Sequence, residues 1–212
     1  MEKLYYRYGS YNGEKIENYF WKKMIEHPDK TPKQVREDLN LYYNNEGNHQ
    51  PIYTMKRKGY SVTKYKKLKI VIGGYHKKFK DPDHCLYNDV IILDDKKNIS
   101  IYGYPIKEFS PLFNHSATIY DHYIYIIGGI CPIVLKERTM FKMKIYQLNL
   151  NNFKINEMKT NNEKILTLYN HKAKLRKDKI YVSSGFNLCN IKNKMKYVYD
   201  IKKNEWIIKK EK

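Results

Sequence analysis

The groups best suited to binding a metal ion crowd into one stretch of the sequence. His76, Asp81, Asp83, His84 and Cys85 lie close together there. Imidazole, carboxylate and thiolate groups are the usual protein ligands of divalent metals. Their spacing matches no established tetrahedral pattern, and Asp-Pro-Asp at 81–83 is also an ordinary turn sequence. We therefore expect a polar loop here, and we predict neither a metal site nor a cofactor.

A second distinctive group alternates along one expected strand. Lys172, Lys174 and Arg176 are separated by single residues, so they share one face of an extended chain. Such a basic patch could attract an anionic partner. It could equally protect the edge of an unclosed array of strands against association with other edges. The sequence leaves both interpretations open.

Motifs of established catalytic sites are missing from the sequence. We find no Gly-x-Ser-x-Gly elbow, no phosphate-binding loop and no His-Glu-x-x-His pair. His115 and His171 each follow an Asn and precede an expected strand. Such equivalent placement in two similar segments favours a structural hydrogen bond over catalysis.

Two apolar strands that end in a double glycine indicate that the chain is built of repeats. Residues 70–74 read IVIGG and residues 124–129 read IYIIGG. Residues 180–185, IYVSSG, form a third copy at nearly the same interval. Other segments share this period, because Ser61 to Tyr65 stand as far before the first glycine pair as Ser116 to Tyr120 stand before the second. The glycines that mark the units are Gly73, Gly74, Gly128, Gly129 and Gly185.

The pattern of apolar segments predicts four short strands in each unit. After the glycine signals come further apolar segments at 89–94, 144–149 and 196–200. A polar turn and a last strand follow, at 153–155 in the second unit and 205–208 in the third. Four short strands in a repeat of about 50 residues are typical of a β-propeller blade.

These residues resemble the kelch repeat, in which a Gly-Gly strand is followed by a Tyr-Asp strand end and a Trp. Residues 114–121, NHSATIYD, and the segment from Tyr199-Asp200 to Trp206 carry the resemblance. It implies a mainly β fold of three kelch-type blades, at about 60–107, 115–160 and 171–212. The third unit has Ser184-Gly185 in place of Gly-Gly, and the first two units lack the late Trp. Since closed propellers need roughly four to eight blades, we expect a partial propeller.

The resemblance also implies a non-enzymatic protein-binding module that presents loops to a protein partner. The loops at 75–86 and 130–141 follow the first two glycine pairs, so we expect them to project side by side. The candidate contact residues are Tyr75, His76, Asp81, Asp83, His84, Lys136 and Arg138. A homodimer that completes a six-bladed ring is a further hypothesis. Because some kelch proteins are enzymes, a small sugar-active propeller enzyme is an alternative.

The net charge of +19 suggests nucleic acid as another partner, since a basic surface attracts phosphate. However, only five of the 41 basic residues are Arg, and Lys is less suited to bidentate contacts with phosphates and bases. The abundance of Lys, Asn, Ile and Tyr also indicates AT-rich coding. Nucleic-acid binding therefore remains the alternative to protein binding.

The first residues, the apolar segments and the cysteines of the sequence indicate where in the cell the protein is expected. The first residues lack the apolar core of a signal peptide, and no uncharged run approaches the ~18 apolar residues of a membrane span. The three cysteines are widely spaced, which fits neither a disulfide framework nor a Cys-x-x-Cys metal site. We predict a cytoplasmic protein without membrane association.

Residues 1–50 have a helical pattern, in contrast to the repeat domain at 51–212. Ile16, Phe20 and Met24 recur every four residues, before His27-Pro28. A second helix should begin at the capping box TPKQ, 31–34, and continue through Val35 to Tyr42. We expect this helical hairpin to pack over a blade edge or over the end of the partial propeller; the alternative is a separate partner-binding device.

Overall fold

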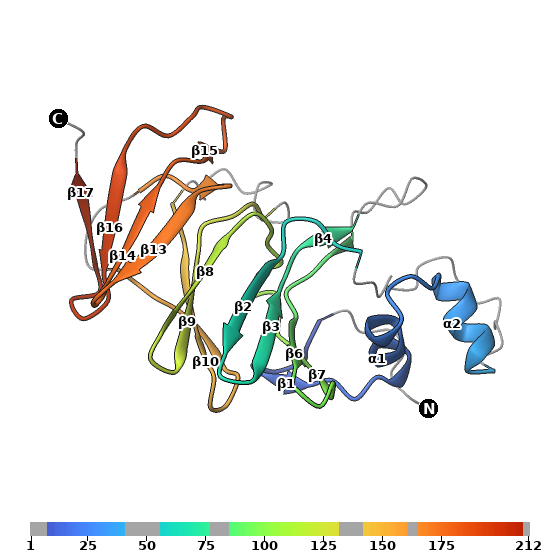
Figure 1. The fold of residues 1–212 in the computed structure, drawn as a ribbon. Helices are drawn as coiled ribbons and strands as arrows, with labels where there is room; N and C mark the ends of the chain where they lie inside the picture. Colours follow the sequence, from blue (N-terminus) through green and yellow to red (C-terminus); the bar gives the residue numbers. More distant parts are fainter. Residues whose placement is uncertain (1–7, 41–55, 77–84, 132–141, 161–164, 210–212) are drawn as a thin grey trace.

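The computed structural model describes residues 8–40, 56–76, 85–131, 142–160 and 165–209. Within them the fold is mainly β, with antiparallel strand pairs and two short helices near the N-terminus, which confirms the predicted class. Three larger sheets follow one another along the chain and lie side by side in Figure 1. Their first strands are in contact, β2 with β8 and β8 with β13.

The three larger sheets share a meander of four strands. The first sheet has the order β1 (Glu14–Lys15), β7 (Ile99–Gly103), β6 (Val90–Leu93), β3 (Leu68–Ile72), β2 (Ser61–Tyr65). The second has the order β11 (Ile155–Glu157), β10 (Ile145–Asn149), β9 (Tyr123–Ile127), β8 (Ser116–Tyr120). The third has the order β13 (Lys172–Arg176), β14 (Lys179–Ser183), β16 (Lys196–Asp200), β17 (Glu205–Lys209). The strands thus form where the repeat predicted them, except that β11 begins at the end of the expected segment 153–155.

Two short pairs of strands lie beside these sheets. They are β4 (Tyr75–His76) with β5 (Cys85–Leu86), and β12 (Leu168–Tyr169) with β15 (Phe186–Asn187). Each pair includes the residues that follow a glycine signal.

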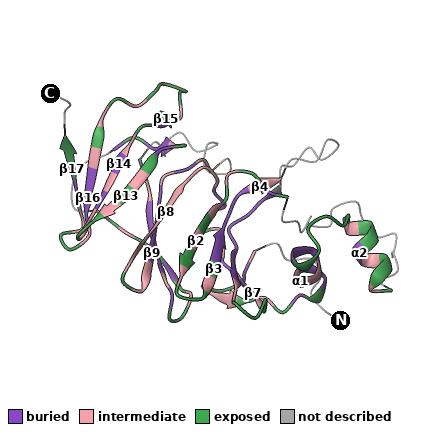
Figure 2. Cartoon of the chain, in the orientation of Figure 1, coloured by how far each residue is buried: buried purple, intermediate pink, exposed green. Residues whose placement is uncertain are grey.

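Alternation along the strands gives each sheet an apolar face that packs against its neighbour. Ile70 and Ile72 of the first sheet share one buried cluster with Ile124 and Ile126 of the second. The other face of the second sheet contributes Tyr125 and Ile127 to a cluster with the third sheet. From the third sheet, this second cluster receives Ile180, Val182, Tyr199 and Trp206. Figure 2 shows the result: β3 and β9 are mostly buried, whereas β17 at the end of the stack is mostly exposed.

The first helix covers the remaining face of the first sheet, and the second helix packs against the first. In α1 (Tyr19–Glu26), Phe20, Trp21 and Met24 are buried against Val71, Ile91 and Ile101. The expected hairpin therefore packs over the end of the stack. Neither helix in the described part of the chain has the length and apolar character needed to cross a membrane.

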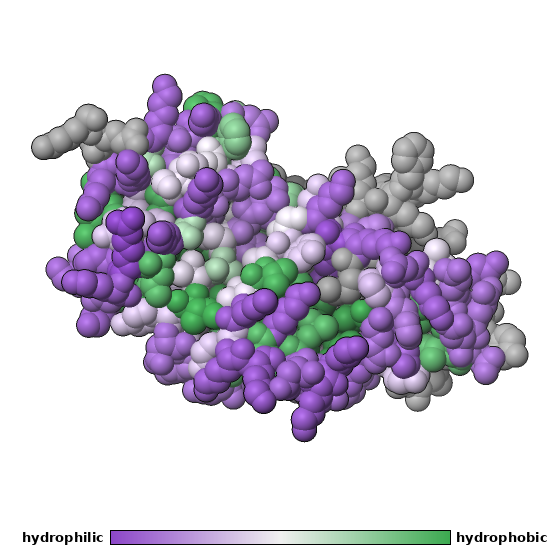
Figure 3. Space-filling view, in the orientation of Figure 1, coloured by the Kyte–Doolittle hydropathy of each residue, from purple (hydrophilic) through white to green (hydrophobic). Residues whose placement is uncertain are grey.

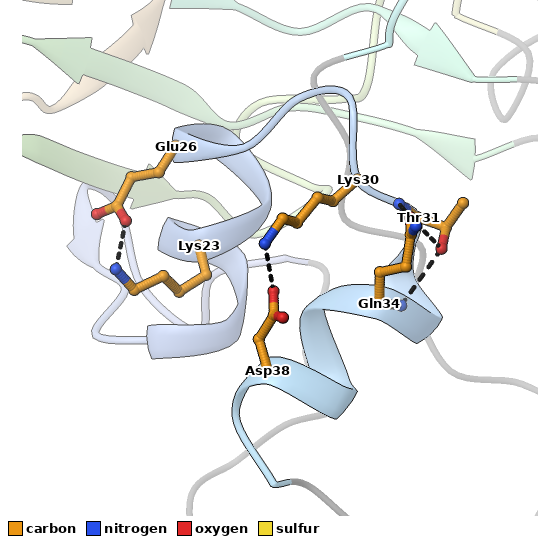
Figure 4. A network of polar contacts seen from close by, with 6 residues as sticks. All are labelled: Lys23, Glu26, Lys30, Thr31, Gln34 and Asp38. Carbon is orange, nitrogen blue, oxygen red and sulfur yellow. Dashed lines mark hydrogen bonds and ion pairs between the residues drawn. The ribbon is translucent and has the colours of Figure 1, made fainter.

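The second helix, α2 (Pro32–Asp38), begins at the predicted capping box. Thr31 Oγ1 accepts a hydrogen bond from the Gln34 backbone, and the Gln34 side chain accepts one from the Thr31 backbone (Figure 4). An ion pair of 2.7 Å joins Lys30 Nζ to Asp38. The helix is shorter than expected, because it ends at Asp38 and Tyr42 lies outside the described residues.

The N-terminal segment also belongs to the sheets, which was not predicted. Glu14 and Lys15 pair with Gly103 and Tyr102, so β1 adds a fifth strand to the first sheet. Asn12 reaches the second sheet: its Nδ2 donates to the Ile155 carbonyl at 2.7 Å, and its Oδ1 accepts from the Ile155 N–H at 2.8 Å. One side chain thus pairs with the outer strand β11 as a backbone would.

We expect Asn12→Ala to lower the free energy of unfolding by about 1 to 3 kcal/mol, because two hydrogen bonds to β11 are lost together. Chemical denaturation followed by circular dichroism measures this change. The matched control is Asn98→Ala, which removes an exposed amide bonded within a turn to Asp94. An Asn12 variant no less stable than this control would show that the side chain does not hold the segment to the second sheet.

Candidate binding surfaces

The glycine pairs form the joints between neighbouring sheets. Gly74 N–H donates to the Leu112 carbonyl at 2.9 Å, and Gly129 N–H donates to the Leu168 carbonyl at 2.8 Å. Gly128 has a φ of 62°, and a Cβ there would lie 2.4 Å from the Leu168 oxygen. A glycine is therefore required wherever another sheet follows.

This geometry explains why the third unit departs from the Gly-Gly pattern. Ser184 occupies the position of Gly73 and Gly128, with a similar φ of 62°. It is exposed, since no described sheet follows the third one. Without a carbonyl packed against it, the serine side chain has room.

Histidine and serine link the sheets at the same level as the glycines. His115 Nε2 is hydrogen-bonded to Ser61 Oγ at 2.8 Å, and His171 Nε2 to Ser116 Oγ at 2.8 Å. The structural role expected for these histidines is therefore observed. The series ends with the third unit, where Lys172 occupies the position of the two serines.

Burial keeps both imidazoles neutral. Desolvation lowers the pKa of His115 to about 3, with a further contribution from His171. Desolvation likewise lowers the pKa of His171 to about 4. The links between the sheets therefore depend on uncharged histidines.

The first unit secures its glycine pair with a buried ion pair. Arg57 donates to both carboxylate oxygens of Asp89, at 2.5 and 2.8 Å, and to the Gly73 carbonyl at 3.2 Å. Its guanidinium also lies 3.6 Å from the centre of the Tyr87 ring. In the sequence, Arg57 follows Lys56 in a basic run just before the first unit. In the structure, however, the Arg57 side chain is buried. The pair was not predicted, because Asp89 is far from Arg57 in the sequence.

The loops after the glycines all leave the same end of the sheets. Tyr75, Ile130 and Phe186 occupy equivalent positions and form equivalent bridges, to Lys58, Phe113 and Tyr169 respectively. In Figure 1, β4 and β15 accordingly lie at the upper end of the stack. We call this set of loops the loop end.

Only two of the predicted contact residues in these loops can be placed. The Tyr75 ring packs against Phe113 at 4.5 Å, and His76 Nδ1 is hydrogen-bonded to the Lys56 carbonyl at 2.8 Å. The remaining candidates lie outside the described residues: Asp81, Asp83, His84, Lys136 and Arg138. Among the residues that the structure does describe, no cluster of His, Cys, Asp or Glu could hold a metal ion.

The third loop, residues 186–192, was missed as a candidate although it follows Gly185 in the same way. Asn187 shapes it, because its Oδ1 accepts from the backbone N–H groups of Cys189 and Ile191, both at 3.0 Å. Two apolar side chains of this loop are exposed to solvent: Ile191 is 63% exposed and Phe186 is 38% exposed. The repeat period alone would have identified this position.

The basic patch lies on one face of the third sheet. Lys172, Lys174 and Arg176 are exposed, whereas Ala173 and Leu175 between them pack toward the second sheet. The alternation expected from the sequence is therefore present. We call the face that carries the three cations the open face, because no further described sheet packs against it.

A small pocket opens between the second and third sheets near the loop end. Its empty volume is about 480 Å³, and this value includes open solvent at the mouth of the pocket. Both Gly128 and Gly129 contribute to its wall, with Cys131, Lys142 and Tyr146 nearby. Lys144, also in the wall, is paired with Glu157 at 2.8 Å, and its pKa is raised. None of the described residues that line the pocket is an acid or a histidine.

No protein-family model matches this chain, and no curated protein sequence matches it either. The kelch resemblance and the functions that it implies therefore rest on the residues described above.

Proposed function

We propose that this protein is a kelch-like array of three propeller blades that binds a protein partner through its loop end. Three observations support the blade assignment: the four-strand meanders, the contacts between their first strands, and the repeated glycine joints. The binding assignment rests chiefly on one observation, which is that the three post-glycine loops start from equivalent bridges at the same end of adjacent sheets. Loops held by a rigid scaffold in this way are common sites of recognition.

The third loop is the best-defined part of this surface. Its apolar residues Phe186 and Ile191 remain exposed although the turn beneath them is hydrogen-bonded. Exposed apolar groups on a preorganised turn lose little conformational entropy when a partner buries them. This favours a protein partner, since the loop end offers an apolar contact in addition to charge.

Affinity purification of the tagged protein from its native cells, with and without nuclease, tests the proposed function. We expect a protein partner that survives nuclease, and we expect Ile191→Ser to weaken its binding by about tenfold. Ile208→Ser is the matched control, because Ile208 is 41% exposed on the outermost strand β17 and lies outside the three loops. Equal binding by the two variants would contradict the loop assignment. Bound material that nuclease removes completely would instead identify a nucleic-acid-binding protein.

A further inference from the structure

The residue pairing of the third sheet places many cations on its open face. The pairs are Lys172 with Ser183, Lys174 with Tyr181, Arg176 with Lys179, and Lys196 with Lys209. The acidic groups on this face are Asp200 and Glu205, which also pair with each other. Asp200 is already bound by Lys179. The open face therefore carries a large excess of positive charge.

This distribution differs from that on the equivalent faces of the other sheets. Lys179, Tyr181 and Ser183 occupy the positions that Leu68, Ile70 and Ile72 hold in the first sheet. Those three residues pack into the core between the first and second sheets. The open face therefore cannot be covered as the other two are, by an apolar sheet.

Solubility alone does not explain why the charged residues on the open face are mostly cations, because a mixture of acidic and basic residues would also be soluble. Arg176 lies directly opposite Lys179, although Asp200 offsets part of the charge of Lys179. Like charges in opposite positions of a sheet are destabilising, whereas alternating signs would be soluble without that cost. Lys172, Lys174 and Arg176 also form no ion pair with another described residue. An anionic occupant would relieve the repulsion.

The preceding sheets show which shape of occupant fits. The face of the first sheet is covered along β2 by the extended strand β8, and β8 is covered in the same way by β13. On β8 the residues that face inward are Ala117 and Ile119, two apart. An extended segment on the open face would likewise present every second side chain to Lys172, Lys174 and Arg176, which repeat every ~7 Å.

We propose that the open face binds an extended acidic segment of another protein, with carboxylates at alternate positions. This surface is separate from the loop end and does not depend on the function proposed for it. A second copy of the chain fits poorly, since its β2 would present Lys64 to the cations and its first sheet is covered by α1. Single-stranded nucleic acid is less suited to this face. The centre of the Tyr181 ring lies 5.4 Å from Arg176 Cζ and 5.7 Å from Lys209 Nζ, so this ring is not free to stack on bases. Figure 3 shows hydrophilic residues over much of this end of the molecule and apolar residues nearer its middle.

Fluorescence anisotropy with a labelled peptide of alternating Glu and Thr tests this proposal at about 0.15 M salt. We expect the intact protein to bind this peptide more tightly than a peptide of the same composition with its Glu residues in one block. Lys172→Ser with Lys174→Thr introduces the residues that Ser61 and Thr63 supply in the first unit, and should weaken binding by about tenfold. Lys172→Arg with Lys174→Arg should preserve it.

The matched control removes two charges elsewhere, with Lys64→Ser and Lys107→Ser, and should leave the affinity unchanged. Equal weakening by the control would overturn the proposal, because net charge alone would then explain the binding. Tighter binding of single-stranded RNA than of the alternating peptide would also overturn it, as would a concentration-dependent dimer in light scattering that the Lys172/Lys174 variant abolishes. Thermal melts of each variant establish that it is folded.

Discussion

Gly128→Ser is expected to lower the free energy of unfolding by about 2 to 5 kcal/mol. The substitution places a Cβ 2.4 Å from the Leu168 oxygen and 2.9 Å from His171 Cε1. Overpacking of this kind costs about 1 to 3 kcal/mol, and a left-handed backbone adds about 1 to 2 kcal/mol for a residue with a side chain. The joint between the second and third sheets should loosen, and the Gly129 hydrogen bond to Leu168 should weaken with it.

The protein supplies its own control for this substitution. Ser184 already occupies the equivalent position in the third unit, with the same φ of 62°. Ser184→Gly should therefore change stability by less than about 1 kcal/mol. Urea denaturation of the two variants measures both values. If Gly128→Ser were as mild as Ser184→Gly, the close approach of the following sheet would not be what requires glycine at the joint.

Acidification from about pH 7.5 to about pH 5 is expected to cost about 4 kcal/mol of stability. The pKa values of His115 and His171 are lowered from 6.5 to about 3 and about 4 in the folded protein. The unfolded chain therefore takes up two protons in this range that the folded protein does not. Stability is complete above pH 6.5 and falls as the pH drops toward the folded values, by about 2 kcal/mol per histidine at pH 5.

The double variant His115→Gln with His171→Gln separates these histidines from the other titrating groups. Glutamine retains a nitrogen near the position of Nε2 but does not titrate, so the loss of stability between pH 6.5 and pH 5 should disappear. The exposed His27→Gln serves as the matched control and should keep the full pH dependence. Carboxylates such as Asp200, whose pKa is lowered by Lys179, lose their contribution only at more acidic pH. An unchanged pH profile in the double variant would refute this explanation.

The main local features of the fold could be predicted from the sequence because they depend on local chemistry. The double glycines predicted the repeat units and the ends of their strands; the structure adds that they form the joints, where a left-handed backbone lies under a carbonyl. Thr31 and Gln34 predicted the start of α2, because a capping box is complete within four residues. The alternation of Lys172, Lys174 and Arg176 predicted a charged strand face, since the period of a β-strand is two.

The features that were missed depend on residues far apart in the chain. Asn12 bonds to Ile155 and Arg57 pairs with Asp89, and neither partner can be recognised from the local sequence. The third loop was not predicted as a candidate for a different reason, because its Ser184-Gly185 departs from the Gly-Gly pattern that marked the other two loops. In the structure this serine is exposed, and no described sheet packs against it.

The sequence by itself determined the period of the repeat, the positions of the strands and of the glycines that end them, and the two helices. These features follow from side-chain size, backbone freedom and periodicity within short segments. Only the tertiary structure decided which face of each sheet is covered. It buried the first sheet under α1, joined β1 and Asn12 to strands remote from them in the chain, and left the cations of β13 on an open face. The physical reason is that burial depends on which surfaces meet in space, and a strand has the same alternation whether or not another sheet lies against it.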